Sequence, residues 1–273
     1  MERITRALEL ALANREAAVN QPAIADTVTD IGRKPAQSNG AETVATAVML
    51  TPDTAMLERE RVLPPGAGGP AGAPYKLLRT QVLKRLDQLG ANTLAILSAA
   101  KADGKTLTAV NLAIAIAAEH GRTALLVDFD LRNPNVHRRF GFAPAVGVED
   151  CLQTGAPLKT AMVKVAGYER LTILPARNPV EHSSELLASQ RTVELVTELR
   201  ARYSNRIMIF DLPPVMLADD ALAFSKIVQA GLVVIAEGRT QRDEVSRAID
   251  LLRDLPIVGT VLNGSRDRVP GYY

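Results

Sequence analysis

Short, uninterrupted apolar runs alternate with amphipathic segments from residue 75 onward. The runs lack the in–out alternation of a half-exposed strand, so we expect each to be a strand that is buried on both faces. They span 93–98, 123–128, 171–174, 207–210, 232–236 and 258–262. Helical patterns predict helices at 75–89, 105–120, 184–201, 219–227 and 240–252, the last capped by Thr240 and Asp243. This alternation predicts an α/β fold: a doubly wound, mostly parallel sheet with helices on both faces.

The chain before this region shows a different pattern. Residues 1–17 repeat apolar side chains at a spacing of four, which predicts a short amphipathic helix. We expect 18–74 to be a flexible linker, because the prolines and glycines of 64–74 disfavour a helix or a central strand. The predicted organisation is completed by a folded domain at 75–265 and a C-terminal tail at 266–273.

Composition and charge exclude several classes of protein. Apolar residues make up 47% and charged residues 23%, as in soluble globular proteins. The 32 basic and 30 acidic residues give a net charge of only +2, which offers no support for a nucleic-acid partner. The apolar runs are far shorter than the roughly 20 residues that span a bilayer, and the charged N-terminus does not resemble a signal peptide. We therefore expect a cytoplasmic protein that reaches a membrane only through a partner.

A phosphate-binding motif follows the first apolar run. Residues 99–106, AAKADGKT, have the spacing A-x-x-x-x-G-K-T and lie between a predicted strand and a predicted helix, as a P-loop requires. Backbone N–H groups at the start of that helix would face the phosphates of ATP. Lys105 would neutralise phosphate oxygens, and the Thr106 hydroxyl would bind Mg²⁺. The residues expected to bind ATP are Ala100, Lys101, Ala102, Asp103, Gly104, Lys105 and Thr106.

Three carboxylates end two further apolar runs. Asp128 and Asp130 are spaced i, i+2, so their side chains point the same way from an extended segment. Asp211 ends the next predicted strand and precedes a Pro-Pro turn, where P-loop enzymes hold Mg²⁺. Ligands of parallel α/β sheets bind at the carboxyl ends of the strands. We therefore expect Thr106, Asp128 and Asp211 to bind Mg²⁺.

Together these motifs make residues 75–264 resemble the cytoplasmic domain of bacterial tyrosine kinases, the P-loop autokinases of exopolysaccharide and capsule export. The resemblance implies a P-loop NTPase fold of the deviant Walker type and catalysis by Lys105, Asp128, Asp130 and Asp211. One of Asp128 or Asp130 would orient or deprotonate the tyrosine hydroxyl. The segment 206–214 and the GYY ending are most similar to the branch found in exosortase-associated loci. The matching segments include YKLLRT (75–80), LLVDFDLRNP (125–134), SELLAS (184–189) and VGTVLNG (258–264).

The same resemblance implies the partners of the protein. Family members act with a membrane-embedded chain-length determinant, or co-polymerase, and phosphorylate one another's C-terminal tyrosines in trans. Here those acceptors would be Tyr272 and Tyr273, on a chain recruited to the inner face of the cell membrane. Asn263 lies where related P-loop proteins contact adenine.

Two alternatives stay open beside this resemblance, and two departures from the family pattern favour the second of them. Ala102 replaces a glycine of the usual P-G-E-G-K loop, and the oligomerisation motif Glu-x-x-Arg-x-x-Arg is reduced to Ala73, Lys76 and Arg79. One alternative is a partitioning or division-type ATPase switch. Such proteins carry a lysine at the second loop position, where this chain has Ala100. The other alternative is a nucleotide-sensing scaffold without kinase activity.

Overall fold

The computed structural model describes residues 48–202 and 205–265. The helix predicted at 1–17 and the tail predicted at 266–273 lie outside these ranges. Within them, no helix is both long enough and apolar enough to cross a membrane.

The described strands form one eight-stranded sheet in the order β1-β4-β5-β3-β6-β2-β7-β8. All neighbouring strands in this sheet run parallel except β4 and β5, which are antiparallel. The predicted doubly wound, mostly parallel sheet is therefore confirmed. The strands are β1 Val48–Leu50, β2 Thr93–Ser98, β3 Thr123–Asp128, β4 Val163–Val165, β5 Leu171–Leu174, β6 Arg206–Asp211, β7 Ala230–Ala236 and β8 Ile257–Asn263.

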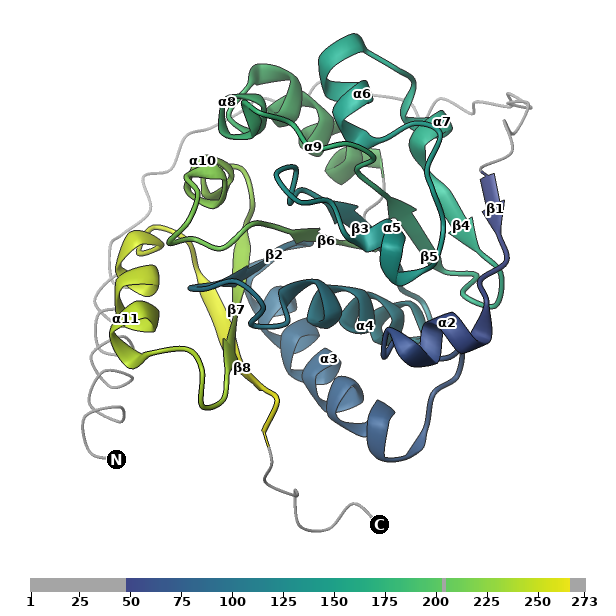
Figure 1. Ribbon diagram of the computed structural model, residues 1–273, viewed down its shortest axis with the longest axis horizontal. Coiled ribbons are helices and arrows are strands. Elements are labelled where there is room, and N and C mark those ends of the chain that lie inside the picture. Colours follow the sequence, from purple (N-terminus) through teal and green to yellow (C-terminus); the bar gives the residue numbers. More distant parts are fainter. Residues whose placement is uncertain (1–47, 203–204, 266–273) are drawn as a thin grey trace, which may run out of the picture. The chain divides into compact units, whose positions relative to one another are not determined.

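Helices cover both faces of the sheet (Figure 1). The helices of one face are α2 Thr54–Arg59, α3 Gly69–Leu89, α4 Lys105–Ala117 and α5 Val136–Arg139. Those of the other are α6 Val148–Thr154, α7 Leu158–Ala161, α8 Ser183–Leu187, α9 Gln190–Arg202, α10 Asp220–Ser225 and α11 Arg242–Leu251.

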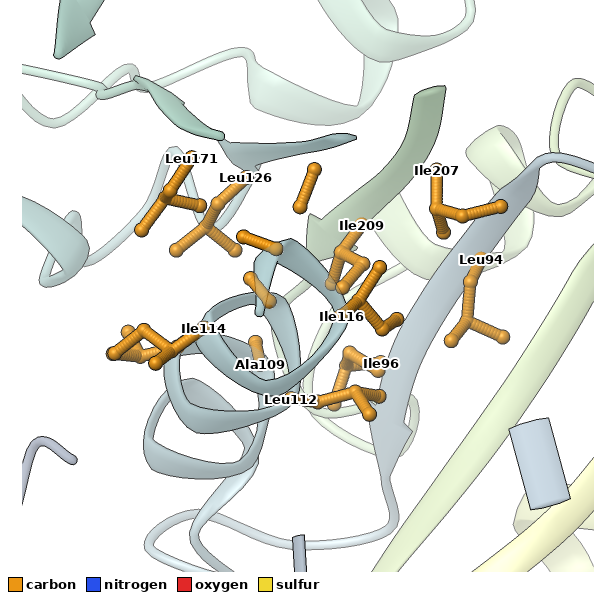
Figure 2. Close-up of a cluster of buried hydrophobic side chains, with 14 of the residues drawn as sticks. Leu94, Ile96, Ala109, Leu112, Ile114, Ile116, Leu126, Leu171, Ile207 and Ile209 are labelled. Atoms are coloured by element: carbon orange, nitrogen blue, oxygen red, sulfur yellow. The ribbon is translucent and has the colours of Figure 1, made fainter. Parts of the chain in front are cut away.

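Two apolar cores explain why the strand sequences are continuously apolar. In β2, Leu94 and Ile96 pack in the core beneath α3 and α4, whereas Ala95 and Leu97 pack in the core on the opposite face. Figure 2 shows the α4 side chains, such as Leu112, gathered with those of the strands. Because both faces of the central strands exclude water, successive positions along the middle of these strands are apolar.

Residues 48–74 are not a linker, contrary to the prediction. They include β1, α2 and the first turn of α3, and Leu63 is buried in the core. The side chain of Asn111 in α4 accepts a hydrogen bond from the Leu63 N–H and donates one to the Arg61 carbonyl, each at 2.9 Å. Pro70 is tolerated because it lies in the first turn of α3, where helical N–H groups have no partner. Tertiary contacts therefore order a segment whose local sequence disfavours regular structure.

Two predicted helices also differ from those observed. The helix expected at 184–201 is two helices, α8 and α9. The last helix is capped by Gln241 and Glu244, because the Glu244 carboxylate accepts a 2.9 Å hydrogen bond from the Gln241 N–H. Thr240, the predicted cap, instead forms a hydrogen bond with Asp103 of the P-loop.

Candidate nucleotide-binding and phosphotransfer site

The P-loop connects β2 to α4 at the carboxyl edge of the sheet. Gly104 precedes α4 with φ 94°, a left-handed conformation that favours glycine. The Asn263 side-chain amide, at the end of β8, donates a 2.8 Å hydrogen bond to the Asp103 carbonyl, and a Cβ at position 104 would collide with this amide. The backbone angle therefore favours glycine here, and any larger residue would also displace the Asn263 amide from the loop.

Ala102 also adopts a left-handed conformation, with φ 60°. This is the position at which the family loop carries glycine. The Arg239 guanidinium donates a hydrogen bond to the Ala102 carbonyl and so helps to hold this peptide in place. The loop thus keeps a backbone conformation that costs an alanine more than a glycine.

Lys105 is buried, with 6% of its surface exposed, rather than facing solvent. Its positive charge lies close enough to Asp130 and Asp211 to oppose the rise in the pKa of each that burial causes. The first turn of α4 therefore supplies the counter-charge of the strand-end carboxylates.

The structure brings Thr106, Asp128 and Asp211 together. The Thr106 hydroxyl donates a 2.6 Å hydrogen bond to Oδ2 of Asp211, and Asp128 pairs with Asp211 in the β3–β6 register. Both carboxylates are completely buried, and Oδ1 of each has no hydrogen-bond partner in the described residues. Burial raises the pKa of Asp211 to about 6, and burial together with the Asp211 charge raises the pKa of Asp128 well above its usual range.

These free oxygens fit a divalent cation. Mg²⁺ is commonly bound by one or two carboxylates together with the phosphates of a substrate, rather than by an all-protein cage. Consistently, the described residues contain no group of three or more His, Cys, Asp or Glu that would hold a metal by themselves. The buried carboxylates and the Thr106 hydroxyl therefore suit a metal that arrives with a nucleotide.

Asp128 and Asp130 occupy different surroundings at the end of β3. Oδ2 of Asp128 accepts hydrogen bonds from the N–H groups of Asn135 and Val136, both at 2.9 Å. Asp130 keeps 8% of its surface exposed and accepts only a 3.2 Å bond from the Asn133 N–H among the hydrogen bonds described. Burial raises the pKa of Asp130 as well. Asp128 is thus completely buried and held in place, whereas Asp130 is buried but keeps a small exposed fraction.

The Asp103 side chain forms hydrogen bonds within the protein rather than serving as a phosphate contact. Its carboxylate is 1% exposed and accepts hydrogen bonds from the Ala100 N–H at 3.0 Å and from the Thr240 hydroxyl at 2.8 Å. The Ala100 N–H is consequently occupied by the protein itself, so the remaining N–H groups of the loop are the candidates for phosphate binding. Sequence reasoning missed the contributions of Thr240 and Arg239, which lie 137 residues from their partners in the chain.

Comparisons with known proteins agree with this geometry. The family described as NUBPL iron-transfer P-loop NTPase (ParA) matches residues 91–270. Tyrosine-protein kinase YwqD of Bacillus subtilis is 30% identical over 204 residues, covering 73% of this chain and 84% of its relative. Succinoglycan biosynthesis transport protein ExoP of Rhizobium meliloti is 33% identical over 175 residues. The match covers 63% of this chain but only 21% of the longer ExoP protein.

Solved structures show the same relationship. The chimerical protein CapA2B2 superposes with a TM-score of 0.69 at 25% identity, over 81% of this chain and 94% of the other. The kinase domain of Escherichia coli tyrosine kinase ETK gives 0.66 at 26% identity, over 74% and 80% of the two chains. MinD of Pyrococcus horikoshii, solved with Mg-ADP, gives 0.54 at 25% identity, over 66% and 74%. The chain therefore belongs to the ParA-type P-loop NTPases and, among them, to the bacterial tyrosine-protein kinases.

Proposed function

We propose that this chain is an ATP-dependent protein-tyrosine autokinase that regulates the polymerisation and export of an exopolysaccharide or capsule. The observation that carries the proposal is the contact between Thr106 and Asp211 beside the free buried oxygens of Asp128 and Asp211. This arrangement matches what a P-loop kinase needs to hold Mg²⁺ and the terminal phosphates of ATP. The link to polysaccharide is supported by the relatives, which include the succinoglycan transport protein ExoP.

The residues of the site take separate roles in this mechanism. Lys105 and the N–H groups from Lys101 to Thr106 bind and orient the phosphates. Thr106, Asp128 and Asp211 would hold Mg²⁺, which would supply positive charge that stabilises phosphoryl transfer. Catalysis then consists mainly of positioning and of charge stabilisation.

Asp130 is the carboxylate that we assign to the acceptor tyrosine. It keeps 8% of its surface exposed, whereas Asp128 is completely buried and held by two backbone N–H groups. The raised pKa of Asp130 makes it a stronger base than an ordinary carboxylate. Asp130 would therefore orient the tyrosine hydroxyl and accept its proton during transfer.

Asn263 remains our proposed contact for adenine. Its Nδ2 donates to the Asp103 carbonyl, so the group proposed to meet the base is Oδ1, which would accept from the adenine amino group. Asn263 would then connect the bound base to the conformation of the P-loop.

We also propose that the phosphate acceptors are Tyr272 and Tyr273, presented in trans by a second copy of the chain. Ten extended residues after Asn263 span roughly 33 Å, enough to enter a neighbouring site. Tyr168 is a poor acceptor, because it is buried, its hydroxyl donates to the Leu63 carbonyl, and burial raises its pKa to about 12. A membrane-embedded chain-length determinant would recruit this cytoplasmic protein to the inner face of the membrane.

Intact-mass measurement after incubation with Mg·ATP tests the kinase proposal. We expect added phosphoryl groups on the wild-type chain and none on Lys105→Met. The likeness to MinD keeps an ATPase switch as the second candidate, for which ATP would be hydrolysed without labelling the protein. Nucleotide binding with neither labelling nor hydrolysis would instead indicate a sensing scaffold.

A further inference from the structure

We propose that Thr240, in the turn between β7 and α11, is a positioning residue that keeps the P-loop able to bind phosphate. Its hydroxyl accepts a 2.9 Å hydrogen bond from the Ala236 N–H at the end of β7 and forms a 2.8 Å bond with Oδ1 of Asp103. A hydroxyl has a single hydrogen, and the ionised Asp103 carboxylate can only accept, so this hydrogen is donated to Asp103. Thr240 therefore connects the sheet directly to the carboxylate of the loop.

The charge of Asp103 explains why this connection matters. A carboxylate in a loop that binds anions has an unfavourable sign, and a buried carboxylate is costly unless donors satisfy its oxygens. Here Oδ2 is satisfied by the Ala100 N–H and Oδ1 by Thr240. Without the Thr240 hydroxyl, Oδ1 would compete for the N–H groups of its own loop, which are the groups that a phosphate needs. Thr240 thus leaves those N–H groups free for the nucleotide.

Two further side chains from the same edge of the sheet donate hydrogen bonds to carbonyl groups of the loop. Arg239 donates to the Ala102 carbonyl, and Asn263 donates to the Asp103 carbonyl. Their supporting strands are neighbours, since Ala236 of β7 pairs with Asn263 of β8. Both carbonyl oxygens are therefore occupied by donors from the protein. The β7–α11 turn and the end of β8 therefore act as one support for the phosphate-binding conformation.

This inference rests on the proposed binding of ATP at the P-loop, but it does not require kinase activity. Its test is the affinity for Mg·ATP, measured by displacement of a fluorescent ATP analogue. Thr240→Val keeps the shape of the side chain and removes the hydroxyl, so we expect about a tenfold weaker affinity. Thr240→Ser restores the hydroxyl and is expected to restore most of the affinity.

Thr192→Val is the matched control. The Thr192 side chain is more deeply buried than that of Thr240 and donates a 2.7 Å hydrogen bond to the Leu186 carbonyl, so the substitution removes a side-chain hydrogen bond of similar length at α9. We expect it to lower the melting temperature without changing the affinity for Mg·ATP. Thr240→Ala also removes the hydroxyl and takes the place of Thr240→Val in the test if that variant does not fold.

The inference is overturned if the folded variants without the Thr240 hydroxyl bind Mg·ATP as the wild type does. It is also overturned if Thr192→Val weakens binding equally, or if Thr240→Ser fails to rescue it. A wild-type chain that binds no Mg·ATP would refute both this inference and the proposed site. If Thr240→Val weakens Mg·ATP binding and Thr240→Ser rescues it, but the wild-type chain transfers no phosphate, the kinase proposal is refuted and this inference stands.

Discussion

Thr106 and Asp211 are joined by a 2.6 Å hydrogen bond across 105 residues of chain. The bond connects the first turn of α4 to the end of β6, and β6 lies beside β2 in the sheet. Two of the three groups that we propose to hold Mg²⁺ are therefore brought together by the order of the strands. This contact, with the unpartnered Oδ1 atoms of Asp128 and Asp211, leads to the following predictions.

Lys105→Met should abolish phosphotransfer and weaken Mg·ATP binding while the chain still folds. The methionine fills most of the buried volume of the lysine but removes the charge that faces Asp130 and Asp211. We expect a rate loss of at least about 100-fold, since electrostatic stabilisation in such sites is worth this much per group. Radiolabel transfer and circular dichroism measure the two effects, and undiminished transfer would refute the P-loop assignment.

Asp211→Asn should stabilise the protein without nucleotide or Mg²⁺ at pH 7.5. The pKa of Asp211 is raised from its ordinary 3.8 to about 6, so the folded chain carries the cost of a buried charge above pH 6 and is free of it below about pH 4. The gain in melting temperature should be about 2–4 °C at pH 7.5 and should shrink as the pH falls toward 4.

The control for this pH dependence is Asp254→Asn, which alters an exposed carboxylate. We expect a small change in melting temperature that does not follow the same pH window, because no buried charge is relieved. Thermal unfolding of both variants across pH 4 to 8 gives the comparison. A gain for Asp211→Asn that persists unchanged at pH 4 would contradict the explanation.

Ala102→Gly should leave nucleotide binding intact and raise stability slightly. The left-handed backbone conformation of Ala102 costs a non-glycine residue about 1–2 kcal/mol, which glycine would relieve. Glycine also raises the conformational entropy of the unfolded chain, which offsets about 0.4–1 kcal/mol of this gain. The expected net gain is about 0.5 kcal/mol in the free energy of unfolding, measured by urea denaturation. Ala118→Gly serves as the comparison, because Ala118 has φ −75° and offers no strain to relieve. The prediction would be contradicted if Ala102→Gly lowered the free energy of unfolding as much as Ala118→Gly does.

Replacing both Tyr272 and Tyr273 by phenylalanine should remove almost all phosphate incorporated from Mg·ATP. The described tyrosines are poor alternatives, since Tyr168 is buried and burial raises the pKa of Tyr75. Peptide mapping of the labelled wild type should locate the phosphate on the C-terminal peptide. Label found on Tyr75 or Tyr168 instead, or unchanged in the double variant, would refute the assignment of the acceptors.

The sequence by itself determined six strands of the sheet, the P-loop and the strand-end carboxylates, but not the short strands β1 and β4. The runs at β2, β3 and β5 are recognisable because a strand covered on both faces must be apolar throughout, and their predicted bounds match those observed. The A-x-x-x-x-G-K-T spacing and the positions of Asp128 and Asp211 are equally local, since each motif follows directly from one strand. Short-range patterns of this kind need no knowledge of which strands become neighbours.

Only the tertiary structure decided what each loop residue contacts. The Asp103 carboxylate accepts a hydrogen bond from Thr240, which lies in a turn 137 residues away. Lys105 is buried because the start of α4 packs at the edge of the sheet. Residues 48–74 are ordered by α4 through Asn111, although their own sequence disfavours regular structure. Hydrogen bonds between distant segments depend on the order of the strands, and no local pattern in the sequence encodes that order.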